Sequence, residues 1–247
     1  MAAYDFAPPR LFVESALCEG ATVELDRAAA NYLLSVLRLG AGDSVLVFNG
    51  RDGEWRARVE PSGRKAADLE IETLVRDQSP RSDLLLMFAP LKHARLDYAV
   101  QKAVEMGVGA LRPVFTRRTV STRINRERMR ANAVEAAEQC GILSVPEILP
   151  ELDLPRALRE LEPGRLLVFC DEEAVAANPA AALAGARAEA GCALLIGPEG
   201  GFDAAERESI LAHPSVRRMS LGPRILRADT AAVAALAVLQ TALGDWR

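Results

Sequence analysis

The spacing of apolar segments changes near residue 80, and this change constrains the fold more than any other feature of the chain. Before residue 75, short apolar segments are separated by tight-turn residues, whereas after residue 84 strand-length apolar segments alternate with helical ones. Short strands joined by turns indicate a small barrel or sandwich, and strand–helix alternation is typical of an α/β fold with a mainly parallel sheet. We therefore expect a β-rich domain over residues 1–75 and an α/β domain over residues 76–247.

Turn residues organise the first domain. The segment 49–53 (Asn-Gly-Arg-Asp-Gly) contains both Asn-Gly and Asp-Gly pairs, which favour β-hairpins. Strands are expected on either side of it, at Ser44–Phe48 and Glu54–Val59, and a further strand at Ala67–Val75. A helix is expected over Arg27–Arg38, ended by the glycines that follow it.

The second domain contains apolar segments of strand length and clear helix boundaries. Strands are expected at Leu84–Ala89, Leu111–Phe115, Leu166–Cys170 and Ala193–Ile196. Helical spacing runs from Leu96 to Val104 before Gly107, which can adopt a left-handed cap. Asn125 can cap a helix that extends to Cys140, and Asp203 with Glu206 forms a capping-box pattern.

The last expected helix, Thr230–Leu243, is apolar around most of its circumference. An exposed apolar face of this size is unfavourable. Two interpretations remain open: the helix is enclosed within its own domain, or it also packs against a second subunit.

Charge is distributed unevenly along the chain. The net charge is −4 over residues 1–75, +7 over residues 76–130 and −7 over residues 131–247. The basic middle third is either a solvated face or a surface that contacts nucleic-acid phosphates.

Composition excludes several classes of protein. No apolar run approaches the roughly 20 residues that a membrane-spanning helix needs, and the first ten residues lack the pattern of a signal peptide, so we expect a cytoplasmic protein. The four cysteines are scattered without a C-x-x-C pair, which favours small buried apolar residues over disulfides. With only two histidines, we expect no metal site.

Two glycine-containing segments near the C-terminus are the strongest candidates for a binding site. These are residues 196–201 (Ile-Gly-Pro-Glu-Gly-Gly) and 221–227 (Leu-Gly-Pro-Arg-Ile-Leu-Arg). Ligands of α/β sheets bind beyond the carboxyl ends of strands, and glycines allow a ligand to approach the backbone closely. Spacing alone favours an ordinary strand-to-helix turn for the first segment, whereas the second is unusually apolar for a surface loop and suits an adenine ring.

Other catalytic and nucleotide-binding motifs are absent from the sequence. It contains neither a G-x-x-x-x-G-K-[ST] phosphate loop nor a G-x-S-x-G nucleophile motif, and no G-x-G-x-x-G follows an early strand. The first strand of the α/β domain leads instead into residues 90–93 (Pro-Leu-Lys-His), which argues against a Rossmann enzyme. His213 precedes a proline and is interpreted as a surface residue.

Both segments, with motifs along nearly the whole chain, resemble the bacterial 16S ribosomal RNA uridine-N3 methyltransferases of the SPOUT superfamily. The matching motifs, in order, are residues 10–13 (RLFV), 36–39 (VLRL) with 42–43 (GD), Lys92 with 101–108 (QKAVEMGV), Pro113 with Thr116 and Arg117, 137–140 (AEQC) with 145–148 (VPEI), the two glycine segments, and 229–231 (DTA). The sequence departs from the family pattern at Asn31-Tyr32, Ile142 and Asp229, and the first two departures concern expected RNA contacts.

The resemblance implies an N-terminal PUA-like β-barrel that helps to hold RNA and a SPOUT-type α/β domain with a trefoil knot. It also implies a homodimer that binds S-adenosylmethionine and methylates N3 of a uridine in 16S ribosomal RNA within the small ribosomal subunit. The expected cofactor-binding residues lie in and just after the two glycine segments: Ile196, Gly197, Pro198, Glu199, Gly200, Leu221, Gly222, Ile225, Leu226 and Thr230.

Uridine N3 must lose a proton to become a good nucleophile. We expect Arg227 to stabilise the anion that forms on the base, and Glu199 to be the weaker candidate for a general base. Glu199 can instead cap the next helix. Basic side chains expected to contact RNA are Arg10, Arg38, Lys92, Lys102 and Arg117.

Two alternative functions remain. One is a non-catalytic RNA-binding module, such as a ribosome-assembly factor that has lost the cofactor, although the intact glycines argue against it. The other is a SPOUT methyltransferase that acts on another RNA, such as transfer RNA.

Overall fold

A computed structural model describes residues 8–63, 65–121, 123–174 and 178–246. The chain divides into two compact units. One comprises the residues up to Pro80 together with Ala137–Val145, and the other comprises Arg81–Ala136 together with the residues from Pro146 onward. The expected boundary after residue 75 stays a prediction.

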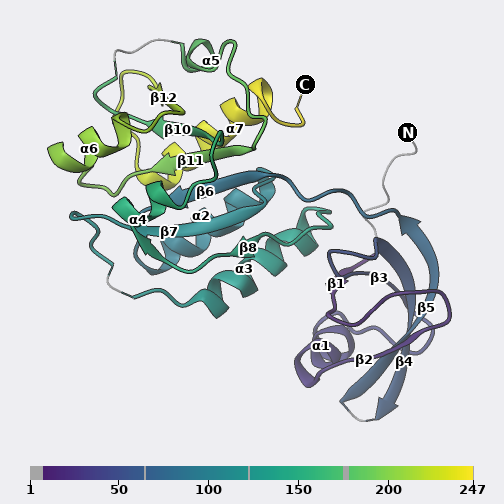
Figure 1. The fold of residues 1–247 in the computed structure, drawn as a ribbon. Coiled ribbons are helices and arrows are strands. Elements are labelled where there is room, and N and C mark those ends of the chain that lie inside the picture. Colours follow the sequence, from purple (N-terminus) through teal and green to yellow (C-terminus); the bar gives the residue numbers. More distant parts are fainter. Residues whose placement is uncertain (1–7, 64, 122, 175–177, 247) are drawn as a thin grey trace. The chain divides into compact units, whose positions relative to one another are not determined.

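The first unit is built on a five-stranded sheet in the order β1-β3-β4-β5-β2. The bounds of its strands are β1 (Arg10–Phe12), β2 (Thr22–Glu24), β3 (Ser44–Phe48), β4 (Glu54–Gly63) and β5 (Ala66–Arg76). Strand β1 runs parallel to β3, and the other neighbours are antiparallel. Figure 1 shows β3, β4 and β5 curving around the small helix α1 (Arg27–Asn31).

The hairpin between β3 and β4 forms where the turn residues predicted it. Gly50 and Gly53 adopt φ values of 82° and 84°, in the left-handed region that glycine tolerates. A Cβ atom on Gly53 would lie 2.4 Å from the carbonyl oxygen of Arg76, so this position has no space for a side chain. Beyond the turn, alternate residues of β4 and β5 face the core of the unit, as Ala57 and Val59 do.

The helix expected over Arg27–Arg38 is shorter and less regular than predicted. Asp26 caps α1 through the N–H of Ala29 at 2.7 Å, but after Asn31 the chain continues as a π-helical turn, η1 (Tyr32–Val36). Its wider bond from the N–H of Leu37 to the carbonyl of Tyr32 replaces regular α-helical bonding. Side-chain periodicity does not distinguish these two backbone hydrogen-bond patterns.

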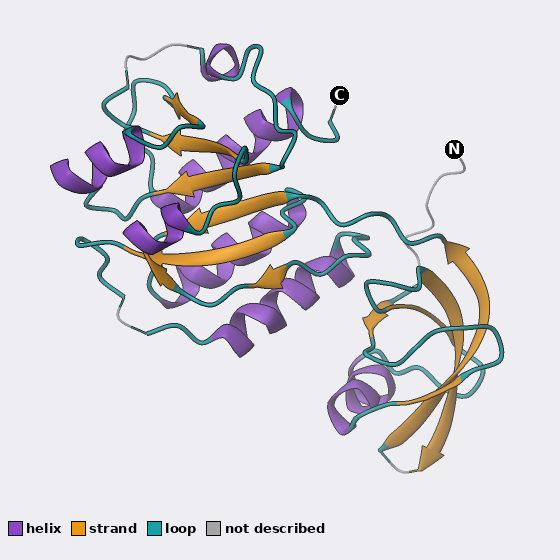
Figure 2. Cartoon of the chain, viewed as in Figure 1, coloured by secondary structure: helices purple, strands orange, loops and turns teal. Residues whose placement is uncertain are grey.

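The second unit contains a seven-stranded parallel sheet, which confirms the predicted α/β class. Six strands follow the order β12-β10-β11-β6-β7-β8, and β9 pairs with β7. The bounds are β6 (Leu84–Phe88), β7 (Ala110–Phe115), β8 (Glu147–Ile148), β9 (Leu152–Asp153), β10 (Leu166–Cys170), β11 (Cys192–Ile196) and β12 (Val216–Met219). Figure 2 shows these strands with helices on both faces of the sheet. The trefoil knot stays a prediction.

Two sets of helices cover the sheet. They are α2 (His93–Glu105), α3 (Arg126–Gln139), α4 (Leu154–Arg159), α5 (Pro179–Ala182), α6 (Ala204–Leu211) and α7 (Ala228–Ala242). Helices α2 and α7 pack against each other, as do α4 and α6. The alternation of side chains along β6 separates two cores: Met87 faces a cluster that includes residues of α4, whereas Leu86 and Phe88 face α2 and α7.

Predicted helix boundaries in the second unit are confirmed. The side chain of Asp203 accepts from the N–H of Glu206 at 2.8 Å, and the side chain of Glu206 accepts in return from the N–H of Asp203 at 3.1 Å, forming the capping box of α6. Asn125 accepts from the N–H of Arg128 at 3.0 Å at the start of α3. Gly107, with φ of 75°, follows the end of α2.

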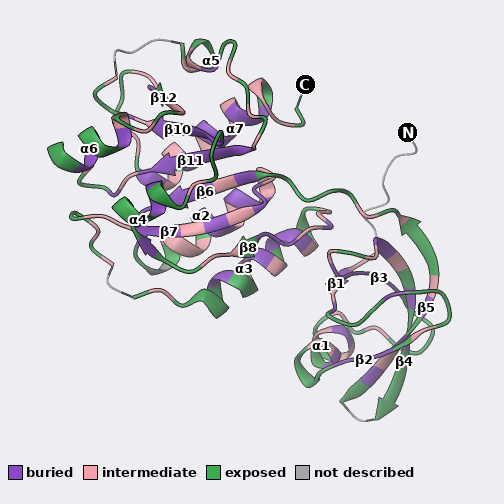
Figure 3. Ribbon diagram, in the orientation of Figure 1, coloured by how far each residue is buried: buried purple, intermediate pink, exposed green. Residues whose placement is uncertain are grey.

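Burial of the last helix is one-sided. In α7, Ala232, Ala235, Leu236 and Leu239 are buried, whereas residues such as Val233 and Val238 are only half-buried (Figure 3). The helix packs against α2, α5 and β11. Among the described helices, none combines the length and the apolar character needed to cross a membrane.

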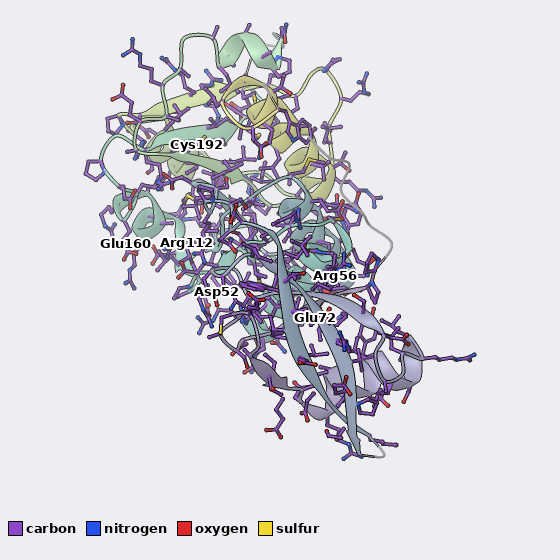
Figure 4. All side chains as sticks on the ribbon, turned by 90° about the vertical axis from the view of Figure 1, so that its right-hand side faces the viewer. Asp52, Arg56, Glu72, Arg112, Glu160 and Cys192 are labelled. Atoms are coloured by element: carbon purple, nitrogen blue, oxygen red, sulfur yellow. The ribbon has the colours of Figure 1, made fainter. Side chains whose placement is uncertain are left out.

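The cysteines only partly follow the prediction of buried apolar residues. Cys192 of β11 is buried (Figure 4), and burial raises the pKa of its thiol to about 12. Cys170 is half-buried, but Cys18 and Cys140 are exposed, so the prediction is wrong for these two. None of the four forms a disulfide with another described residue.

Candidate functional site

A cavity of about 260 Å³ lies at the carboxyl ends of β10, β11 and β12. These three strands are neighbours in the sheet, and because they are parallel, the loops that follow them meet at one edge. The lining comes from the end of β10, from the loops after β11 and β12, and from the start of α7. Figure 1 shows β10, β11 and β12 side by side in the second unit.

In the loop after β11, neighbouring atoms leave little space for a side chain at two of the glycines. A Cβ atom on Gly197 would lie 2.6 Å from the ring of Phe202, and one on Gly201 would lie 2.7 Å from Oε1 of Glu172. Gly201 also has φ of 67°, and its N–H bonds to the carbonyl of Pro198 at 2.9 Å. The segment is therefore a tight turn, and this turn also forms one wall of the cavity.

The loop after β12 combines a glycine turn with apolar side chains. Gly222 has φ of 95°, and its N–H contacts Oγ of Ser220 at 3.3 Å. Leu221 and Leu226 are half-buried beside the cavity. Ile225 also borders it, but its side chain is 91% exposed.

Most of the residues expected to bind a cofactor come together at this cavity. Eight of the ten line it: Ile196, Gly197, Pro198, Glu199, Leu221, Gly222, Ile225 and Leu226. Gly200 and Thr230 do not line it. Gly200 is exposed and its carbonyl accepts a hydrogen bond from Arg118 at 2.7 Å, and Thr230 is exposed on α7.

Sequence reasoning missed the contribution of β10. Its last residues and the acidic segment after it, Phe169–Ala174, form a third wall. Further lining residues that were missed are Phe202, Arg207, Met219, Ser220, Pro223, Arg224, Ala228 and Ala231. Leu166–Cys170 was predicted as a buried strand, so the three acidic residues directly after it could have indicated the site.

Asp171 organises this third wall. It is only 3% exposed and accepts hydrogen bonds from Nη2 of Arg207 at 2.9 Å, from Nε of Arg218 at 2.7 Å and from the N–H of Glu173 at 3.0 Å. Burial by itself would raise the pKa of Asp171, but these hydrogen bonds outweigh it and hold the pKa below its ordinary value. Asp171 is therefore a charged anchor of the loop.

The two residues expected to take part in the chemistry have different surroundings. Glu199 lines the cavity and forms an ion pair with Arg95 of α2. Arg227 is exposed at the N-cap position of α7, and its side chain does not cap the helix. Arg227 is not among the residues that line the cavity, and no ion pair of its guanidinium is found within the described part of the chain.

Arg10, which was expected to contact RNA, is buried within the first unit. Its side chain is 4% exposed, and its Nε donates to Glu54 at 2.6 Å. Its guanidinium also donates to the carbonyls of Ala137, Glu138 and Ile142, the last two at 2.8 and 3.0 Å. A phosphate cannot reach this guanidinium unless these buried hydrogen bonds break.

The other basic candidates are at least partly accessible. Arg38 is exposed in the first unit, and Lys92 is exposed at the start of α2. Lys102 is half-buried and pairs with Glu105 at 2.6 Å. Arg117 is 70% exposed and pairs with Asp203 at 2.7 Å, at the N-terminus of α6.

Comparison with known proteins gives matches over nearly the whole chain. A family model described as an RNA methyltransferase domain matches residues 77–240, and one described as an RNA methyltransferase PUA domain matches residues 25–72. Ribosomal RNA small subunit methyltransferase E of Synechocystis sp. is 31% identical, over 90% of this chain and 74% of its own. The protein of that name from Rickettsia conorii is 29% identical, over 92% of this chain and 93% of its own.

A solved structure shares the fold of this chain over almost the full length of both proteins. Ribosomal RNA small subunit methyltransferase E from Neisseria gonorrhoeae, crystallised with S-adenosyl methionine, is 29% identical and superposes with a TM-score of 0.84. The alignment covers 97% of this chain and all of the other.

Proposed function

Because the chain belongs to the RNA methyltransferase family, we propose that it transfers the methyl group of S-adenosylmethionine to N3 of a uridine in the 16S RNA of the small ribosomal subunit. The observation that carries this proposal is the cavity at the carboxyl ends of β10, β11 and β12. Both glycine loops line this cavity. Relatives that match the chain over most of its length are named ribosomal RNA small subunit methyltransferases.

The chemistry of the cavity fits S-adenosylmethionine. This cofactor has an apolar ring system, a ribose and a positively charged sulfonium. Ile196, Leu221 and Leu226 offer apolar surface, while the carboxylates of Glu172 and Glu173 suit hydroxyl groups and positive charge. The eight lining residues predicted from the sequence would hold the cofactor, and roles for Gly200 and Thr230 stay predictions.

When bound, the cofactor supplies a methyl group already activated by the sulfonium charge, so the protein must align the acceptor and handle its proton. Arg227 is suited to stabilise the negative charge that develops on the uracil oxygens, because it is exposed beside the second loop and is not engaged in an ion pair with the described residues. Glu199 is less suited as the base, since its carboxylate is already paired with Arg95 rather than free to accept a proton from the substrate.

RNA would be held by basic residues from both units. The PUA domain match supports an RNA-binding role for the first unit, where Arg38 is exposed. In the second unit, the exposed basic side chains of Lys92 and Arg117, together with Lys102, lie within the basic part of the chain. Pairing such residues with phosphates gives salt-dependent binding.

We also propose that the protein acts as a homodimer in the cytoplasm, where ribosomal subunits are assembled. The half-buried apolar residues of α7 and the exposed Ile225 support a partner on this side of the second unit. Light scattering after size-exclusion chromatography would give the mass of a dimer, and a monomer at micromolar concentration would refute this part.

The function is tested by mass spectrometry of ribosomal RNA from a strain that lacks the gene. We expect the loss of one methyluridine from 16S RNA and its restoration by the purified protein with S-adenosylmethionine. An unchanged modification map would refute the ribosomal substrate and direct attention to transfer RNA. Calorimetry that detects no binding of S-adenosylmethionine to the purified protein would instead favour a non-catalytic RNA-binding module.

A further inference from the structure

Arg95 connects two segments of the cavity that are distant in the sequence. It lies in the first turn of α2 and does not line the cavity. Its Nε donates to Oδ2 of Asp229 at 2.9 Å and its Nη2 to Oδ1 of the same carboxylate at 2.9 Å. Its Nη1 pairs with the carboxylate of Glu199.

One carboxylate, that of Glu199, lies in the first glycine loop, and the other, that of Asp229, lies in the first turn of α7, directly after the second glycine loop. A single guanidinium therefore joins both loops to α2. Its planar fork makes the paired contact with Asp229 geometrically specific, which an ammonium group cannot reproduce.

The ion pair between Arg95 and Asp229 is partly buried, so breaking it is costly. The side chain of Asp229 is 14% exposed and that of Arg95 is 28% exposed. The hydrogen bonds from Arg95 lower the pKa of Asp229, and the N–H of Thr230 donates to the same carboxylate at 2.9 Å. If Arg95 is removed, Asp229 stays largely buried without its main partner.

We infer that Arg95 is a positioning residue for the methyl donor, which fixes the two cofactor loops relative to each other through Asp229 and Glu199. This inference rests on the proposed function. It assigns Glu199 the role of an anchor for the first loop rather than that of a general base.

The test compares Arg95→Ala, Arg95→Lys and Asp229→Asn with the wild-type protein. S-adenosylmethionine affinity is measured by calorimetry, and methylation of small-subunit RNA gives kcat and the KM of each substrate. For Arg95→Ala we expect about tenfold to a hundredfold weaker cofactor binding, because charge-assisted hydrogen bonds to a partly buried carboxylate are lost. Arg95→Lys should restore part of the affinity, since it keeps the charge but not the fork.

Asp97→Asn is the matched control. Asp97 lies on the same helix, accepts two hydrogen bonds from Arg128 at 2.9 and 2.6 Å, and is not among the residues that line the cavity. It should leave the KM for S-adenosylmethionine unchanged. Adding Asp229→Asn to Arg95→Ala should have little further effect on affinity, because both changes break the same contact.

Glu199→Gln separates an anchor from a base. A glutamine can still accept from Arg95, so the anchor role predicts a kcat near that of the wild type at saturating cofactor. A large loss of kcat at saturating cofactor would identify Glu199 as a base and overturn its assignment.

Unchanged cofactor affinity in Arg95→Ala would overturn the positioning role of Arg95, whether or not the KM for RNA rises. If Arg95→Ala does not fold, the cofactor affinities of Arg95→Lys and Asp229→Asn are compared with that of the wild type instead. A wild-type protein that binds no S-adenosylmethionine refutes the proposed function itself, whereas wild-type binding with no change in the Arg95 variants refutes only this inference.

Discussion

Replacing Arg10 by Met should destabilise the first unit rather than weaken RNA binding directly. Arg10 and Glu54 form a buried ion pair at 2.6 Å, with side chains that are 4% and 0% exposed. Methionine fills much of the space of the arginine stem and leaves the ion pair between Glu54 and Arg76, at 2.7 Å, in place. It also removes the donors to the carbonyls of Glu138 and Ile142.

The expected loss follows from these contacts. Removing one partner of a buried ion pair costs about 3–5 kcal/mol. Because Arg76 still compensates part of the charge on Glu54, we expect a value near the lower end, about 3 kcal/mol. The free energy of unfolding is measured by urea denaturation followed by circular dichroism, and RNA affinity is measured under conditions in which the variant is folded.

Arg58→Met provides a control within the same sheet. Arg58 of β4 pairs with Glu72 of β5, a residue labelled in Figure 4, but its side chain is 47% exposed. Exposed ion pairs contribute little to stability, so this variant should unfold like the wild type. If Arg10→Met also keeps wild-type stability but binds RNA more weakly with a reduced salt dependence, the assignment of Arg10 as a buried structural residue is refuted.

Three further predictions concern other parts of the chain. Burial would raise the pKa of Glu54, but the hydrogen bonds from Arg76 and Arg10 lower it below its ordinary value of 4.5. The stability that this charge contributes is therefore present above pH 4.5 and is lost as the pH falls through the folded-state pKa. When the free energy of unfolding is measured against pH, Glu54→Gln should not show this loss. Gly197→Ala places a Cβ atom 2.6 Å from the ring of Phe202, so calorimetry should detect weaker binding of S-adenosylmethionine, and wild-type affinity would contradict the steric argument. Arg227→Ala should lower kcat by about a hundredfold with little change in cofactor affinity, and an unchanged kcat in single-turnover assays would exclude its role in stabilising the anion.

Local pattern in the sequence predicted most of the longer elements of the fold. The apolar strands Leu84–Phe88 and Cys192–Ile196, the turn at Gly53 and the capping box of Asp203 were all predictable, because each depends on residues a few positions apart. The carboxyl-end rule for parallel strands then located the cavity at the two glycine loops. The identity of the cofactor came from the family resemblance and not from these patterns.

Strand order was decided only by the tertiary structure, and it determined which residues share the site. Strand β10 lies between β12 and β11, so the acidic segment that follows it meets both glycine loops. The order of strands along the sequence does not reveal which strands are neighbours in the sheet. For example, β11 pairs with β6, which precedes it by about a hundred residues.

Side-chain roles depended on the same long-range contacts. Arg10 has the sequence context of an exposed basic residue, yet it is buried against carbonyls more than a hundred residues away. Arg95 gave no signal in the sequence, because both of its partners belong to loops near the C-terminus. The sequence by itself predicted most of the longer elements and the two glycine loops, since these depend on local interactions. Only the tertiary structure decided which charges are buried, which are paired and which remain accessible to a substrate, because those properties depend on residues brought together by the sheet.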